Sequence, residues 1–93
     1  MIHEKSYIDP DIQIEEPLPM NIQSLIKELE EFDRAGQWWL YFERNYDLWV
    51  NAKNAYVAGD ISKRTWDELT KKYMTYSEKI YHEENPSNEG TRF

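Results

Sequence analysis

The stretch from Gln37 to Gly59 limits the possible folds more than any other part of the 93-residue chain. It contains three of the four tryptophans and three of the seven tyrosines. On a helical wheel at about 100° per residue, its apolar side chains span about 220°, whereas a surface helix needs an apolar face of only about 100° or a little more. A helix this apolar must be covered on more than one side, so the sequence predicts neighbours on both of its flanks.

The middle of this wide apolar arc is predicted to form the core. Trp38, Trp49 and Tyr56 share one direction on the wheel, and other apolar residues fan out to either side. Most of these aromatic side chains are expected to be buried. The alternative is an aromatic groove that stays open for a ligand or a partner.

Two further segments have the spacing of helices with a single buried face. The three predicted helices run over about residues 21–35, 37–58 and 62–83. The first and third carry apolar stripes of about 120–140°. Short turns make consecutive helices antiparallel neighbours. The predicted fold class is therefore all-α: a small three-helix antiparallel, up-down-up bundle in which both outer helices pack against the aromatic one.

The ends of these helices are marked by residues with known capping roles. Gly36 and Gly59 follow the first two helices, where glycine readily adopts the left-handed conformation that ends a helix. Asn21 and Ser62 precede helical segments, and both are expected to act as N-caps. Residues 21–84 are thus predicted to form one three-helix domain.

The two ends of the chain differ in composition from the middle. Residues 1–20 hold three of the four prolines, and five acidic residues against one lysine, which favours a flexible acidic arm. The arm also contains apolar residues, so packing along the bundle or insertion into a partner stays open. Residues 85–93 are predicted to be a flexible tail. The net charge of −7 lies mostly in these two segments and disfavours non-specific binding to nucleic acid or anionic lipid.

The chain lacks the residues on which most catalytic and metal sites depend. It has no cysteine, three glycines, and two histidines, His3 and His82, which lie in or beside the predicted tails. These residues supply no nucleophile–base pair, no phosphate-binding loop and no metal-ligand cluster. We therefore expect no enzymatic activity, no cofactor and no metal. No apolar run reaches the roughly 18 residues of a membrane span, so a cytoplasmic protein is expected.

Direct nucleic-acid binding is not expected either. The third predicted helix carries basic residues, but Asp67, Glu68 and Glu78 interrupt them, whereas a DNA-reading helix has a clean basic stripe. The overall acidity leaves an alternative function open: an acidic regulator or inhibitor of a nucleic-acid-handling protein, of the phage or mobile-element type. Binding of that kind would weaken steeply with salt.

The stretch from Leu48 to Met74 contains a helix end, a Gly-x-Ile-Ser turn and a second helix with an early aromatic residue. The residues that form this pattern are Gly59, Ile61, Ser62, Trp66, Leu69 and Lys71. The pattern resembles the short bacterial helical hairpin known as SHOCT, although Lys63-Arg64-Thr65 replaces the usual acidic run of that family. The resemblance implies oligomerisation or protein binding rather than catalysis.

The favoured function is that of a small non-enzymatic protein-interaction module, which acts through an aromatic-rich helical surface on itself or on another protein. Two outer helices with narrow stripes leave the edges of the wide arc uncovered. Trp and Tyr side chains are also frequent anchors at protein interfaces. The candidate partner-surface residues are Trp39, Tyr46 and Val50 on one edge of the arc, and Tyr41 and Leu48 on the other.

Overall fold

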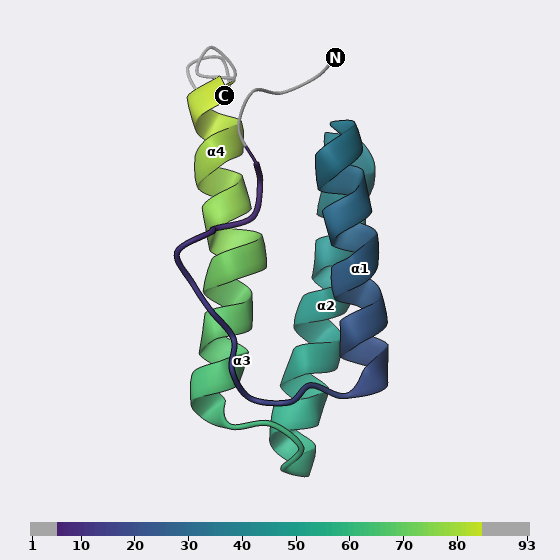
Figure 1. The fold of residues 1–93 in the computed structure, drawn as a ribbon, viewed down its shortest axis with the longest axis vertical. Coiled ribbons are helices and arrows are strands. Elements are labelled where there is room, and N and C mark those ends of the chain that lie inside the picture. Colours follow the sequence, from purple (N-terminus) through teal and green to yellow (C-terminus); the bar gives the residue numbers. More distant parts are fainter. Residues whose placement is uncertain (1–5, 85–93) are drawn as a thin grey trace, which may run out of the picture.

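The computed structural model describes residues 6–84, and every regular element among them is helical. The segments α3, η1 and α4 follow one another without a break, so they form one rod that contains a π-helical turn (Figure 1). The fold class is therefore confirmed as a small all-α bundle of three antiparallel rods. The elements are α1 (Met20–Ala35), α2 (Trp38–Ala58), α3 (Lys63–Thr70), η1 (Lys71–Thr75) and α4 (Tyr76–Glu84).

The aromatic helix α2 is the central element of the bundle. It packs against α1 on one side and against α3 and η1 on the other. Over residues 6–84, no Cα atom of α1 comes within 8 Å of one in the α3–α4 rod. The wide apolar arc of α2 follows from this arrangement, because α2 alone contacts both neighbours.

The turns between the helices form as the capping rules predict. Gly36 has φ of 71° and Gly59 has φ of 85°, both in the left-handed region that favours glycine. The Ser62 hydroxyl accepts a hydrogen bond from the Thr65 N–H at 3.1 Å, as an N-cap should. The prediction that Asn21 caps the first helix is wrong.

The first helix begins one residue earlier than expected, at Met20, directly after Pro19. The fixed φ of proline suits a helix start, and the Pro19 carbonyl accepts from the Ile22 and Gln23 N–H groups at 3.1 and 3.0 Å. The Asn21 side chain instead donates to the Asn51 side chain on α2 at 2.9 Å.

The buried face of α2 is rotated relative to the prediction. Its centre lies at Tyr41, Leu48 and Ala52, each at most 1% exposed, whereas Trp38 is 40% exposed. Small residues such as Ala52 let neighbouring helices approach closely, and the bulky indoles lie on the flank of that contact. The buried apolar residues are Tyr7, Ile22, Leu29, Tyr41, Leu48, Ala52, Ala55, Ile61, Leu69, Tyr73 and Ile80.

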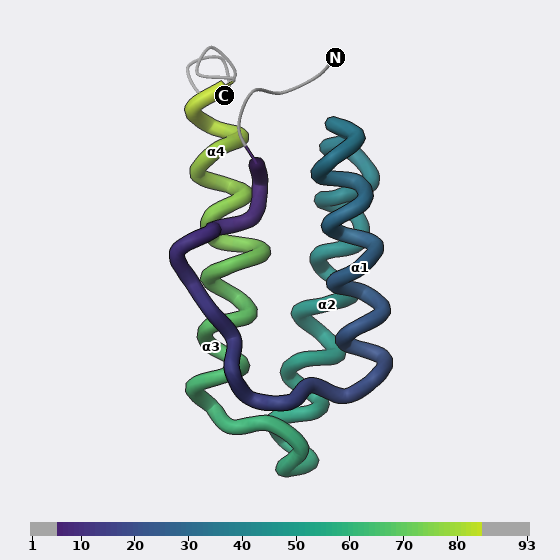
Figure 2. Tube along the Cα trace, viewed as in Figure 1, coloured from purple at the N-terminus to yellow at the C-terminus, as the bar shows by residue number. Residues whose placement is uncertain are grey.

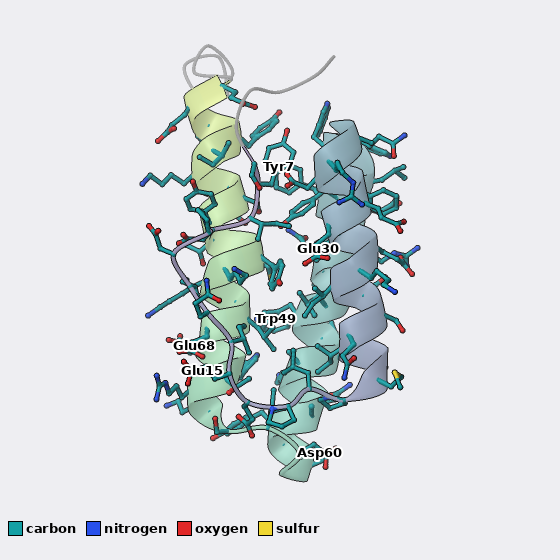
Figure 3. The ribbon with its side chains drawn as sticks, in the orientation of Figure 1. Tyr7, Glu15, Glu30, Trp49, Asp60 and Glu68 are labelled. Atoms are coloured by element: carbon teal, nitrogen blue, oxygen red, sulfur yellow. The ribbon has the colours of Figure 1, made fainter. Side chains whose placement is uncertain are left out.

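The N-terminal arm, as far as it is described (residues 6–19), packs on the bundle. It runs along the α3–α4 rod and then crosses to the start of α1 (Figure 2). Tyr7 is 2% exposed and points into the space between α4 and the α1–α2 pair (Figure 3). Of the three alternatives for the arm (a flexible segment, packing along the bundle, and insertion into a partner), packing along the bundle holds for residues 6–19, where the expectation of a flexible segment is wrong. The tails predicted at residues 1–5 and 85–93 lie outside the described residues.

The π-helical turn η1 is where the arm attaches to the rod. A π turn widens the helix and directs backbone carbonyls toward partners outside it. The Lys72 carbonyl accepts from the Asp9 N–H at 3.1 Å, and the Tyr73 carbonyl accepts from the Tyr41 hydroxyl at 2.8 Å. In return, the Lys72 ammonium donates to the carbonyls of Asp9 and Ile12, both at 2.7 Å.

A second attachment lies at the start of α3. One Glu16 carboxylate oxygen accepts from the Ser62 N–H at 3.1 Å, from the Ser62 hydroxyl at 2.9 Å, and from the Thr65 hydroxyl. The hydrogen bond from Thr65, together with those from Ser62, lowers the pKa of Glu16. A carboxylate at a helix N-terminus is also favoured by the helix dipole. The arm thus contributes to the cap of α3.

Within the described part of the chain, none of the helices combines the length and apolar character that a membrane span requires.

Candidate functional site

The five predicted partner-surface residues separate into two groups in the structure. Trp39 is 65% exposed and Tyr46 is 60% exposed, and Val50 beside them is half-buried. Tyr41 and Leu48 are buried, so their assignment to a partner surface is wrong. Their edge of the arc is the one that faces the other elements of the bundle.

Tyr41 shows why that edge is closed. Its ring lies 5.3 Å from the ring of Tyr7 in the arm, and its hydroxyl donates to the Tyr73 carbonyl of η1. Burial raises the pKa of the Tyr41 hydroxyl strongly, which keeps it protonated as a donor. Leu48 belongs to the same buried cluster, together with Leu69 of α3.

The exposed edge continues along the whole length of α2. Val57, which is 73% exposed, extends it beyond the predicted residues. We call Trp39, Tyr46, Val50 and Val57 the outer stripe. Their separations of seven, four and seven residues place them on one face of the helix, over about 27 Å at 1.5 Å per residue.

Two charged residues lie on the same face of α2 as the outer stripe. Glu43 and Lys53 are exposed, and each lies four or seven residues from members of the stripe. No ion pair of Glu43 is recorded within residues 6–84. The Lys53 ammonium lies 5.6 Å from the centroid of the Trp49 ring, and Trp49 stacks on Tyr46 at 6.2 Å. One face of α2 therefore presents aromatic, aliphatic and oppositely charged groups together.

Trp49 bridges the outer stripe and the α2–α3 contact. Its ring lies 6.4 Å from that of Trp66, which stacks on Tyr56 at 5.2 Å (Trp49 is labelled in Figure 3). Trp49 is half-buried, so the expectation that it lies at the centre of the core is wrong. These aromatic pairs join α2 to the start of α3.

A cavity of about 490 Å³ opens where α2 and α4 diverge. Among the described residues, no Cα atom of α4 lies within 8 Å of one in α2, and large side chains fill part of the gap. We call this cavity the aromatic pocket. It is lined by Trp38, Trp39, Phe42, Glu43, Glu78, Tyr81 and His82.

The sequence held a partial signal for the aromatic pocket. Trp38 and Phe42 are four residues apart, and Glu78 is followed by Tyr81 at a spacing of three, so each pair shares one helix face. Trp38 was expected in the core, and Glu78 stood out only as an acidic residue among the basic residues of the third predicted helix. Only the divergence of α2 and α4 brings these four side chains to one cavity.

Searches against protein-family models, curated proteins and solved structures find no match to the chain. The likeness to the SHOCT hairpin therefore stays a prediction. Within residues 6–84, no group of three or more His, Asp or Glu side chains is placed to hold a metal ion.

Proposed function

We propose that the chain is a non-enzymatic protein-interaction module whose binding face is the outer stripe, and that its partner is a second copy of the chain. The observation that carries the proposal is the exposure of Trp39, Tyr46 and Val57, at 60–73%, along one face of one helix. Large exposed apolar side chains in a continuous row are typical of a protein–protein contact. Trp and Tyr are also the residues that most often dominate such contacts.

The spacing of the stripe favours a second copy. Trp39 and Val57 each lie nine residues from Leu48, and Tyr46 and Val50 each lie two residues from it. An antiparallel copy related by a twofold axis level with Leu48 brings Trp39 against Val57 of the second copy, and Tyr46 against Val50 of the second copy. Each large aromatic ring then meets a small aliphatic side chain, as close packing between helices requires.

The charged residues obey the same symmetry. Glu43 and Lys53 each lie five residues from Leu48, so the twofold axis brings Glu43 opposite Lys53 of the second copy. With Trp39, Tyr46, Val50 and Val57, they follow the a and d spacing of a heptad repeat, and antiparallel helix pairs place a opposite d. Opposite charges at this position favour the antiparallel register over a shifted one.

The contact is expected to be weak. One helix face of about 30 Å falls among small interfaces, below about 1,200 Å² in total, which are typical of transient association. A dissociation constant in the micromolar range, or about −8 kcal/mol, is consistent with that size.

A charge exchange tests both the partner and the register. Glu43→Lys alone and Lys53→Glu alone each place like charges opposite one another, so each is expected to weaken association at least about tenfold. The double variant restores opposite charges and is expected to associate like the wild type. Light scattering over a range of concentrations measures the result.

Lys27→Glu, at an exposed position on α1, is the matched control and should leave association unchanged. If the double variant associates no better than the single variants, the antiparallel register is wrong. If the wild type stays monomeric at all concentrations, self-association through the stripe is wrong.

A further inference from the structure

The aromatic pocket has walls of one chemical character and a rim of another. Trp38 and Phe42 of α2 face Tyr81 of α4, with ring centroids 5.6 Å apart for Trp38–Tyr81 and 5.5 Å apart for Phe42–Tyr81. Glu43 and Glu78 line the same cavity from the two helices. The volume of about 490 Å³ is large enough for a small organic group.

The pocket is lined by two carboxylates, those of Glu43 and Glu78, and by one imidazole, that of His82. No Lys or Arg is among its described lining residues, and no ion pair of Glu43 or Glu78 is recorded within residues 6–84. Aromatic faces carry partial negative charge, and they attract cations within about 6 Å of the ring centroid. Carboxylates beside aromatic faces therefore select for a positively charged ligand and against a neutral or anionic one.

The ring orientations narrow the shape of that ligand. The planes of the three rings make angles of 38° for Trp38–Tyr81, 65° for Trp38–Phe42 and 79° for Phe42–Tyr81. A planar guanidinium stacks best against parallel faces, and none of these pairs of rings is parallel. A tetrahedral ammonium that carries alkyl groups touches rings in several orientations at once, and its alkyl groups bury apolar surface.

We propose that the aromatic pocket binds an alkylammonium group, supplied either by a small quaternary amine or by a methylated lysine side chain. Trp38, Phe42 and Tyr81 provide the cation–π contacts, and Glu78 provides the charge. The pocket shares Trp39 and Glu43 with the proposed contact between copies, but Glu78 and Tyr81 lie on α4, outside the outer stripe, so the site goes beyond self-association.

The test compares choline with its neutral isostere 3,3-dimethylbutan-1-ol, which has the same shape without the charge. NMR titration of the full chain follows the indole N–H signals of the tryptophans. Choline is expected to bind at least about tenfold more tightly than the isostere, because the free energies of a few cation–π contacts add up to that difference in affinity. Equal binding of the two would show a purely apolar cavity, and no binding of choline would show no site; either result overturns the proposal.

Variants on α4 separate this site from the outer stripe. Glu78→Gln and Tyr81→Leu are each expected to weaken choline binding at least about threefold, while the association measured by light scattering stays unchanged. Glu31→Gln, at an exposed position on α1, is the control. If Glu78→Gln and Tyr81→Leu both bind choline like the wild type, the assignment to this pocket is wrong.

The source of the ammonium is read from a second titration. A short peptide with trimethyllysine, compared with the same peptide with unmodified lysine, is expected to bind more tightly if a protein supplies the group. Tighter binding of choline than of the trimethyllysine peptide assigns the site to a small amine. Both results support the alkylammonium site and differ only in its source.

Discussion

Replacement of Tyr7 by alanine tests whether the N-terminal arm is part of the hydrophobic core. The Tyr7 side chain is 2% exposed, and its ring lies 5.3 Å from Tyr41 and 5.5 Å from Phe42. Burial raises the pKa of its hydroxyl to about 12. The Tyr7 backbone N–H donates to Asp33 at 2.7 Å, and this bond persists in the alanine variant, so the substitution removes the ring packing on Tyr41 and Phe42 and keeps the backbone contact.

The expected loss is large for a domain of this size. Truncation of a buried aromatic side chain to alanine typically costs about 3–5 kcal/mol, which includes the cavity that remains. The two ring contacts contribute about 0.5–1.5 kcal/mol each within that total. We expect Tyr7→Ala to lose about 3 kcal/mol of unfolding free energy. At about 4–8 °C per kcal/mol, the melting temperature falls by at least about 12 °C.

Urea denaturation followed by tryptophan fluorescence measures this loss. Asp11→Ala, at an exposed position in the same arm, is the control and should change stability by less than about 0.5 kcal/mol. A loss of less than about 1 kcal/mol for Tyr7→Ala would refute the role of the arm in the core.

Three further predictions concern the polar groups that join the arm, α2 and the rod. Hydrogen bonds lower the folded-state pKa of Glu16 from 4.5, so its contribution to stability is present above pH 4.5 and is lost as the pH falls through the folded pKa. Acid titration should therefore release the arm, which NMR can follow at the Ser62 amide. Glu16→Gln should make stability less dependent on pH in this range. Burial raises the pKa of Tyr7 and Tyr73 to about 12, so their contribution to folding stability is complete below pH 10 and is lost as the pH rises toward 12. Tyrosinate absorbance should show that these two hydroxyls ionise only as the chain unfolds. Tyr41→Phe removes the 2.8 Å hydrogen bond to the Tyr73 carbonyl and should cost about 0.5–1.5 kcal/mol in urea denaturation, because the Asn45 Nδ2 at 3.4 Å still donates to that carbonyl. No measurable cost would show that Asn45 alone satisfies the carbonyl.

The features that local rules govern were predictable from the sequence. Gly36 and Gly59 end helices because only glycine adopts the left-handed region at little cost, and Ser62 caps α3 through its own hydroxyl. The central position of α2 followed from the width of its apolar arc. These features depend on a few neighbouring residues, so they carry a signal in any short window of the sequence.

The features that depend on tertiary contacts were not predictable. The helical wheel placed both Trp39 and Tyr41 at the edges of one wide apolar arc. Tyr41 is buried and Trp39 is exposed because the arm and η1 pack on the Tyr41 edge. The docking of the arm rests on backbone carbonyls near Lys72, which the side-chain pattern does not reveal. Proline and acidic residues suggested a flexible arm because composition does not report such backbone pairing.

The most direct test of the proposed function is the molar mass of the wild-type chain across concentration, measured by sedimentation equilibrium beside a Tyr46→Ala variant. Tyr46 is 60% exposed, so its truncation should leave the fold intact while it removes a large part of the outer stripe. The mass of the wild type is expected to rise from 11.3 kDa toward twice that value at micromolar to millimolar concentration. The Tyr46→Ala variant is expected to reach the same mass only at a protein concentration at least about tenfold higher. A wild-type mass of 11.3 kDa at every concentration, or equal association of the two chains, would contradict self-association through the outer stripe.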